Sequence, residues 1–214
     1  SRVNYRNLRE KEYLPRDDIF FSEENELAYV YASPVDKQSG TIGDFGMVLY
    51  KGTDPLIQKH LKRCFAIDKE IFEQVSVGIT FAEIYTIATK NFEKYNLSNN
   101  IISTTDNAVV NIGHTVPSFA EFTTAEKDVL ENNDWTVIKD ALSKKRKFIN
   151  ALEKTKTQQG MAITLEPRLT VIDNPAIPMA SYHTIIALHK NGEKELLTNF
   201  DKIFELMRMG YMKG

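Results

Sequence analysis

Four short segments carry side chains able to ligate a metal ion or to move a proton. They contain Asp44 in Gly43-Asp44-Phe45-Gly46, His114 after Gly113, Glu166 in Thr164-Leu165-Glu166-Pro167, and His183 in Ser181-Tyr182-His183-Thr184. Carboxylate oxygens and imidazole nitrogens suit divalent transition metals, and the same groups serve in general acid–base catalysis. Because the segments are far apart in the sequence, a shared site depends on the fold.

Glu166 and His114 also have simpler structural explanations. Glu166 ends an apolar run, where a buried carboxylate needs a cation or a hydrogen-bond donor. Arg168 follows two residues later and would point to the same face of a strand, so a salt bridge between the two is one alternative. His114 lies in an apolar loop, where backbone groups could satisfy its ring. Both alternatives stay open at this point.

Asp44-Phe45-Gly46 is also the tripeptide with which protein kinases hold magnesium. A kinase needs in addition a glycine-rich loop, a strand lysine and a His-Arg-Asp loop, and the sequence contains none of these. The tripeptide therefore does not indicate a kinase.

The composition is that of an ordinary globular protein, and we expect one domain over residues 1–214. The 214 residues include 27 Lys+Arg and 29 Asp+Glu, a net charge of −2, so no bulk basic field favours nucleic acid or a membrane surface. No apolar run approaches the roughly 18 residues of a membrane span. The single Cys64 cannot form an internal disulfide. These features predict a cytoplasmic protein that binds neither nucleic acid nor membrane.

The elements that must position these residues begin with short strands. We expect strands at 19–21, 27–32 and 45–50, with the turn segment Pro34–Gly43 joining the last two as a hairpin. Asp54 and Pro55 predict the start of a helix of about five turns. Thr80 and Glu83 form a capping box that predicts a second helix, packed on the first.

The second half of the chain is predicted to return to strands. A capping box of Thr123 and Glu126 starts a short helix. Further helices are expected at 143–155 and at 199–209. In the first of these, the basic residues Lys144–Lys147 are expected to be solvated surface. Strands are expected at 161–165, 169–172 and 183–189, and Asn191-Gly192 predicts a hairpin turn after the last. This order predicts an α+β fold with an antiparallel sheet.

In sequence order these segments resemble the pita-bread metallopeptidases, which include methionine aminopeptidase, aminopeptidase P and prolidase. Leu14–Phe21 resembles the family's opening aspartate strand, Gly43-Asp44 its second metal-aspartate strand, and Gly113-His114 its metal histidine. Thr164–Pro167 resembles its Thr-Ile-Glu-Pro motif and Tyr182–Thr198 its closing Glu-His-Thr hairpin. The resemblance covers nearly all of the chain but about the C-terminal two thirds of the family domain.

The resemblance implies part of a pita-bread fold, with helices flanking a curved antiparallel sheet. The family holds two divalent ions with two Asp, one His and two Glu, and Asp44, His114 and Glu166 fall on three of these five positions. Two carboxylates balance one divalent cation in a low-dielectric site. We therefore expect one ion at most, and oxygen and imidazole ligands suit manganese, iron, zinc or cobalt.

Two family ligands are not cleanly matched. The first aspartate falls on Ser22 or on Ser33, depending on the alignment of the opening strand, and Asp36 or Glu23 could replace it. The last glutamate falls on Tyr182, which could donate a hydrogen bond or ligate weakly.

Two functional hypotheses follow. The first is a divergent metal-dependent hydrolase, of aminopeptidase, dipeptidase or Xaa-Pro peptidase type, in which one metal ion activates water for attack on a peptide or small amide. His183 or Tyr182 would assist proton transfer. The alternative is a catalytically inactive, metal-free binding module, as in the peptidase-like domain of a histone chaperone. Because the family's N-terminal part has no counterpart here, we also expect a homodimer or association with a separate N-terminal part.

Overall fold

The computed structural model describes residues 26–32, 43–99, 109–116, 122–131 and 144–213. The expected strand at 19–21 and the candidate ligand Asp36 lie outside these ranges. The described elements, in chain order, are β1 (Glu26–Ala32), β2 (Phe45–Lys51), α1 (Pro55–Gln74), α2 (Phe81–Lys94), β3 (Leu97–Asn99), β4 (Asn111–His114), α3 (Thr124–Glu131), β5 (Phe148–Asn150), β6 (Ala162–Leu165), β7 (Arg168–Val171), β8 (Ala180–Ser181), β9 (Thr184–Leu188), β10 (Lys194–Leu197), α5 (Asp201–Leu206) and η4 (Gly210–Met212).

Strands β1 and β2 pair antiparallel, as the sequence predicts. The register runs from Glu26 opposite Lys51 to Ala32 opposite Phe45. Side chains alternate between the two faces of a strand, so Tyr29 and Tyr31 share one face of β1. Asp44 directly precedes β2 and is thereby held at the end of this hairpin.

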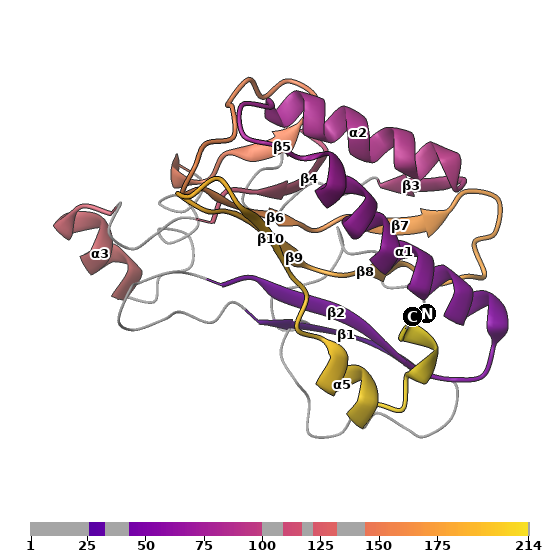
Figure 1. Ribbon diagram of the computed structural model, residues 1–214. Helices are drawn as coiled ribbons and strands as arrows, with labels where there is room; N and C mark the ends of the chain where they lie inside the picture. The colour runs from indigo at the N-terminus through magenta and orange to yellow at the C-terminus, as the bar shows by residue number, and fades with distance from the viewer. Residues whose placement is uncertain (1–25, 33–42, 100–108, 117–121, 132–143, 214) are drawn as a thin grey trace.

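Helices α1 and α2 begin at the predicted caps. The Asp54 carboxylate accepts a hydrogen bond from the Leu56 N–H at 2.8 Å, and Pro55 occupies the first turn. At α2, the Thr80 hydroxyl and the Glu83 carboxylate exchange bonds with each other's backbone N–H groups. The two helices pack against each other, and Figure 1 shows both lying along the same side of the strands. Their buried apolar faces cover the core of the protein.

All named strand pairs are antiparallel and form small sheets, in the orders β1-β2, β10-β9-β6, β3-β7-β8 and β4-β5. Isolated bridges connect them, between Met47 and Tyr182 and between Thr115 and Ile163. The mixture of helices and antiparallel strands agrees with the predicted α+β class. One continuous curved sheet is not seen among the described strands.

Among its described residues, the helix predicted at 143–155 is confirmed only at Lys144 and Lys145, and it is wrong for residues 146–155. Phe148 and Ile149 lie in β5, which pairs with β4 and is buried. The Asn150 side chain then accepts hydrogen bonds from the N–H groups of Leu152 and Glu153, which turns the chain. Such Asn–backbone bonds compete with helix formation. The closing helix is also shorter than predicted, because α5 ends at Leu206 and is followed by η4.

Lys194 of β10 closes the C-terminal end of α1. Its ammonium group donates hydrogen bonds to the carbonyl oxygens of Phe72, Glu73 and Val75 at 2.7, 2.9 and 3.0 Å. These carbonyls belong to the last turn and cap of the helix, where backbone acceptors lack intrahelical partners and a cation is favourable. The β9–β10 hairpin is thereby fastened to α1.

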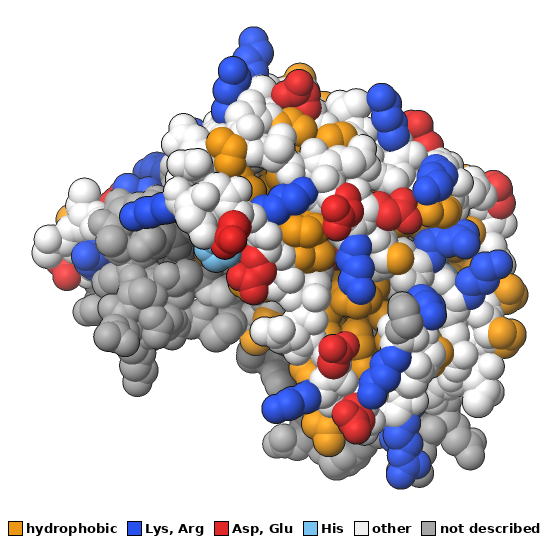
Figure 2. Space-filling model, viewed as in Figure 1, with side chains coloured by type: hydrophobic (Ala, Val, Ile, Leu, Met, Phe, Trp, Pro, Cys, Tyr) orange, Lys and Arg blue, Asp and Glu red, His pale blue; other side chains and the backbone are white. Residues whose placement is uncertain are grey.

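The surface carries charges of both signs. Figure 2 shows Lys and Arg interspersed with Asp and Glu on the face in view, without a large patch of one sign. In the part of the chain that the structure describes, no helix combines the length and apolar character that crossing a bilayer requires. The cytoplasmic location stays a prediction.

Candidate functional site

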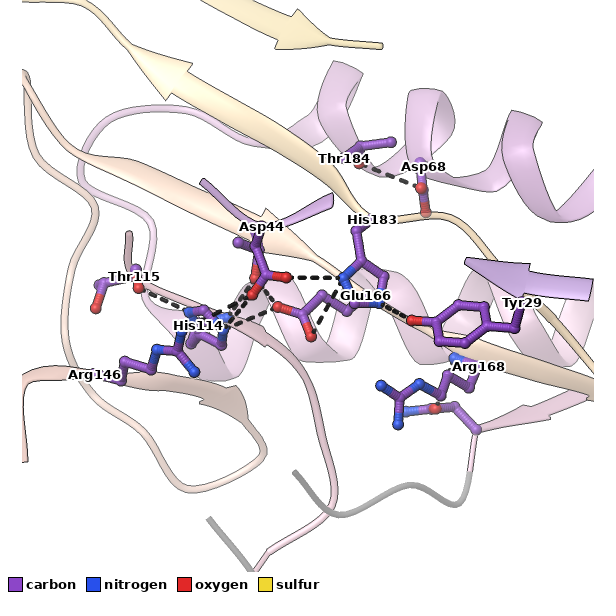
Figure 3. Close-up of polar contacts among 12 residues, drawn as sticks. Tyr29, Asp44, Asp68, His114, Thr115, Arg146, Glu166, Arg168, His183 and Thr184 are labelled. Carbon is purple, nitrogen blue, oxygen red and sulfur yellow. Dashed lines mark hydrogen bonds and ion pairs between the residues drawn. The ribbon is translucent and has the colours of Figure 1, made fainter. Parts of the chain in front are cut away.

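Asp44, His114, Glu166 and His183 converge in one cluster, in which Glu166 is partly exposed and the other three are buried (Figure 3). The His114 Nε2 lies 3.3 Å from the Asp44 Oδ2 and 3.0 Å from the Glu166 Oε1. The His183 Nδ1 lies 3.3 Å from the Asp44 Oδ1 and 3.9 Å from the Glu166 Oε2. The four residues come from the ends of four different strands, β2, β4, β6 and β9.

The orientation of His114 is fixed by the backbone. Its Nδ1 lies 2.8 Å from the carbonyl oxygen of Thr115, which can only accept, so Nδ1 carries the hydrogen and Nε2 faces the carboxylates. The backbone N–H of His114 donates to the Thr164 hydroxyl, which in turn donates to the Glu166 Oε1. Both interpretations of His114 therefore hold, since one ring nitrogen donates to the backbone and the other faces the carboxylates of the site.

Gly113 permits this close approach of β4 to β6. Its φ is +149°, and a Cβ at this position would lie 2.0 Å from the Thr164 carbonyl oxygen. A residue with a side chain would have to push the two strands apart. Gly113 therefore allows His114 to reach the carboxylate that follows β6.

Opposite charges outweigh burial in this cluster. Burial disfavours a charged imidazole, but Glu166 and Asp44 raise the pKa of His114 to about 9. Burial likewise disfavours a charged carboxylate, yet His114 and His183 hold the pKa of Glu166 well below its usual range. The pKa of Asp44 is also lowered, against both its burial and the charge of Glu166, by its hydrogen bonds to the two histidines. Without an ion, both carboxylates are charged and His114 is protonated at neutral pH.

His183 is held on both sides of its ring. Its side chain is 0% exposed, and its Nε2 lies 2.7 Å from the hydroxyl oxygen of Tyr29 on β1. The Tyr31 ring contacts it edge-on, with ring centroids 5.6 Å apart. Tyr29 belongs to none of the motifs that single out the other site residues. The sequence feature that could have identified it is the pair Tyr29 and Tyr31, which share one face of the strand that precedes Asp44.

Arg146 corrects the prediction that Lys144–Lys147 is entirely solvated surface. Its guanidinium lies 4.0 Å from the Asp44 Oδ2, and its side chain is only 10% exposed. The strand β5 begins two residues later, and its pairing with β4 brings Arg146 beside His114 (Figure 3). The cluster therefore has a neighbouring fixed positive charge.

Tyr182 does not lie in the cluster, so the prediction that it assists proton transfer, donates a hydrogen bond or ligates weakly there is wrong. It is 1% exposed, packs against Phe65, and directs its hydroxyl toward the Met212 sulfur at 3.9 Å. Burial raises the pKa of its hydroxyl. Neighbouring residues of an extended chain point to opposite faces, so placing His183 in the site turns Tyr182 into the core.

The donor set fits a divalent metal ion. One ligand atom each from Asp44, Glu166 and His183 lies within 4.8 Å of the others, and the His114 Nε2 adjoins both carboxylates. Two carboxylates and imidazole nitrogens are a common donor set for manganese, iron, cobalt and zinc. Among the described residues, two carboxylates provide charge for one such ion.

Comparison with solved structures finds the same fold in peptidases. The prolidase of Pyrococcus horikoshii OT3 aligns with a TM-score of 0.56 at 19% identity, over 87% of this chain and 44% of that chain. Dipeptidase PepE of Mycobacterium ulcerans aligns with a TM-score of 0.55 at 14% identity, over 81% of this chain and 38% of that chain. The chain thus spans less than half the length of either enzyme. At identities this low, the structural alignments show a similarity of fold alone.

A further similar structure is the N-terminal domain of the FACT complex subunit SPT16 from Eremothecium gossypii. It aligns with a TM-score of 0.51 at 11% identity, over 78% of this chain and 33% of that chain. No protein-family sequence model and no curated protein sequence matches the chain.

Proposed function

We propose that this protein is a peptidase-like metallohydrolase that uses one divalent ion held by the Asp44, His114 and Glu166 side chains. The observation that carries the proposal is the convergence of the buried Asp44 and His114 with the partly exposed Glu166, from three distant strands. The similarity of the fold to a prolidase and a dipeptidase supports a peptide or small amide, including Xaa-Pro peptides, as substrate.

The residues of the site have separable roles in this mechanism. When bound, the ion would supply Lewis-acid chemistry for hydrolysis of an amide bond. Asp44 and Glu166 balance its charge, and the carbonyl of Thr115 keeps the His114 Nε2 directed at it. Arg146 places a positive charge next to Asp44, which favours a substrate with an anionic group nearby.

Metal content tests the proposal directly. The purified protein is loaded with Mn²⁺, Co²⁺ or Zn²⁺, freed of excess ion and analysed by inductively coupled plasma mass spectrometry. We expect about one ion per chain, because Asp44 and Glu166 carry two negative charges. Asp44→Ala and His114→Ala should abolish retention. His189→Ala is the matched control, since His189 is an exposed histidine paired with Glu195. Two tightly held ions, or full retention in His114→Ala, would contradict the proposal.

A metal-free binding module is the second candidate. Its support is that His114, protonated, satisfies both carboxylates without an ion, and that a FACT complex subunit has a domain of similar fold. A protein that retains no ion at saturating concentrations and hydrolyses no Xaa-Pro dipeptide would favour this candidate. A homodimer, or association with a separate N-terminal part, remains a prediction that sedimentation velocity would test.

A further inference from the structure

We propose that Tyr29 is a positioning residue that holds the His183 Nδ1 toward Asp44 and Glu166, so that His183 becomes an additional ligand of the ion. This inference rests on the proposed function, since it assigns a further ligand to the same site. It differs from the proton-transfer role that the sequence suggests for His183.

The two ring nitrogens of His183 have different neighbours. Nε2 meets the Tyr29 hydroxyl at 2.7 Å, whereas Nδ1 faces the Asp44 Oδ1 at 3.3 Å and the Glu166 Oε2 at 3.9 Å (Figure 3). Histidines that ligate metals commonly donate their other ring N–H to an oxygen acceptor, which fixes the ring and its tautomer. If Nδ1 held an ion, Nε2 would carry the hydrogen and would donate it to the Tyr29 oxygen.

Gly46 provides the space in which Tyr29 and His183 meet. The His183 backbone N–H donates to the Gly46 carbonyl at 2.7 Å, so β2 and the start of β9 are in direct contact. A Cβ on Gly46 would lie 2.8 Å from the Tyr29 hydroxyl oxygen and 2.9 Å from carbons of the His183 ring. The bond to Gly46 thus fixes the backbone of His183, and the Tyr29 hydroxyl fixes the Nε2 end of its ring.

Burial favours a ligand over a proton carrier. The His183 side chain is 0% exposed, and both of its nitrogens already have polar neighbours within the protein. A proton carrier must reach the reacting groups, whereas a ligand must be directed at the ion and be shielded from water. His183 would then supply the donor that the family takes from its last glutamate, but without adding negative charge.

Co²⁺ binding tests the role of Tyr29, because the visible spectrum of Co²⁺ reports its ligands and geometry independently of activity. Wild type and Tyr29→Phe are titrated with Co²⁺ by absorption spectroscopy and by calorimetry. Loss of a hydrogen bond to a ligating histidine typically weakens metal binding 10–100-fold, so we expect a loss of about 10-fold and an altered spectrum.

Tyr31→Phe is the matched control. The Tyr31 ring also contacts His183, but from an exposed position on the same face of β1. We expect this variant to keep the affinity and the spectrum of wild type. Near-ultraviolet circular dichroism of each variant checks that it is folded.

A measurement on wild type keeps the inference testable even if Tyr29→Phe fails to fold. The imidazole ¹⁵N shifts of His183 are followed by NMR during Zn²⁺ addition, and we expect Nδ1 to become the zinc-bound nitrogen while Nε2 stays protonated. Zinc binding that leaves Nδ1 unperturbed overturns the inference and leaves the proposed function standing. Co²⁺ binding and spectra that are identical in wild type and Tyr29→Phe do the same. A wild type that binds neither ion overturns both.

Discussion

Two buried aspartates lie on either side of the segment 183–184, Asp44 next to His183 and Asp68 next to Thr184, and their pKa values shift in opposite directions although burial raises both. Asp44 is 6% exposed and next to His183, whereas Asp68 is 1% exposed and accepts a hydrogen bond from the Thr184 hydroxyl at 3.2 Å. Histidines lower the pKa of Asp44, but burial raises the pKa of Asp68 well above its usual range. Adjacent residues of an extended chain therefore separate two very different polar environments.

The Asp68 side belongs to a polar stripe on the buried face of α1, made of His60, Cys64 and Asp68. The His60 Nε2 lies 3.3 Å from the Leu169 carbonyl oxygen, and the Cys64 sulfur lies 3.6 Å from the His60 Nδ1. The Asp68 Oδ1 has no hydrogen-bond partner among the described residues. These residues are four apart on one helix, so they line up along its face but do not converge on a point.

The comparison shows that burial of ionisable groups does not by itself indicate a site. In the α1 stripe, burial favours the neutral forms, since it raises the pKa of the Cys64 thiol and lowers that of His60. In the site, by contrast, His114 and the two carboxylates, Asp44 and Glu166, stabilise one another's charged forms from three different strands. Convergence with complementary charge is what makes the Asp44 side a candidate for chemistry.

Removing a carboxylate from the charged cluster should have the largest effect on the free energy of unfolding. Glu166→Gln removes the carboxylate that lies 3.0 Å from the His114 Nε2 and receives the Thr164 hydroxyl bond. Removing one partner of a buried ion pair typically costs 3–5 kcal/mol, so we expect a loss of about 3 kcal/mol in the free energy of unfolding. The measurement is urea denaturation of the EDTA-treated protein at pH 7.

The surface pair of Glu195 and His189 gives the matched control for Glu166→Gln. Its atoms lie 3.2 Å apart, but both side chains are about half exposed. An exposed ion pair contributes about 0–1 kcal/mol, so Glu195→Gln should leave the unfolding curve nearly unchanged. Equal losses in both variants would show that the buried cluster has no special stability.

Replacing Asp68 should raise the free energy of unfolding, in contrast to the loss expected for Glu166→Gln. Because the pKa of Asp68 is raised in the folded state, the folded protein binds more protons than the unfolded chain above the ordinary pKa of Asp. The stability of wild type therefore falls as pH rises from about 4 toward the folded-state pKa. Asp68→Asn removes this penalty, and we expect it to stabilise the protein by about 2 kcal/mol at pH 8.

The pH dependence provides the control for Asp68→Asn. The gain over wild type should shrink as pH falls toward about 3, below the ordinary pKa of Asp, where the Asp68 carboxyl is protonated in both states. Urea denaturation of both proteins at a series of pH values measures it. A variant less stable than wild type at pH 8 would show that the carboxylate is needed in this environment.

The smallest effect is expected at Cys64. Cys64→Ala removes a buried sulfur and leaves a small void, which should cost about 1 kcal/mol. Because burial raises the pKa of the thiol, wild-type Cys64 should react with Ellman's reagent only slowly until urea unfolds the protein. Rapid reaction in the native state would show that α1 opens locally or that this face is accessible.

The parts of the fold that depend on local chemistry were predictable from the sequence. The caps at Asp54 and Thr80 and the turn at Asn191-Gly192 act over a few residues, and each is found where the pattern indicates. The approximate strands around Asp44 and Glu166 follow from apolar runs in the same way.

Features that depend on distant pairing were missed. Residues 148–150 form a strand because β4 lies beside them, and this pairing also buries Arg146 next to Asp44. The meeting of Tyr29 with His183 joins residues 154 positions apart, and no local pattern encodes it. The order of the motifs predicted that Asp44, His114 and Glu166 lie close together, which the structure confirms. It did not show whether Tyr182 or its neighbour His183 faces them.

The bonds from Lys194 to the end of α1 have a consequence for biosynthesis. The last turn of a helix that ends at Gln74 receives its capping cation from a residue that the ribosome adds some 120 positions later. In a nascent chain whose β9–β10 hairpin has not yet left the ribosome, the carbonyl groups of this helix end lack the Lys194 ammonium and are hydrated instead. Completion of this end of α1 therefore awaits the synthesis of β10.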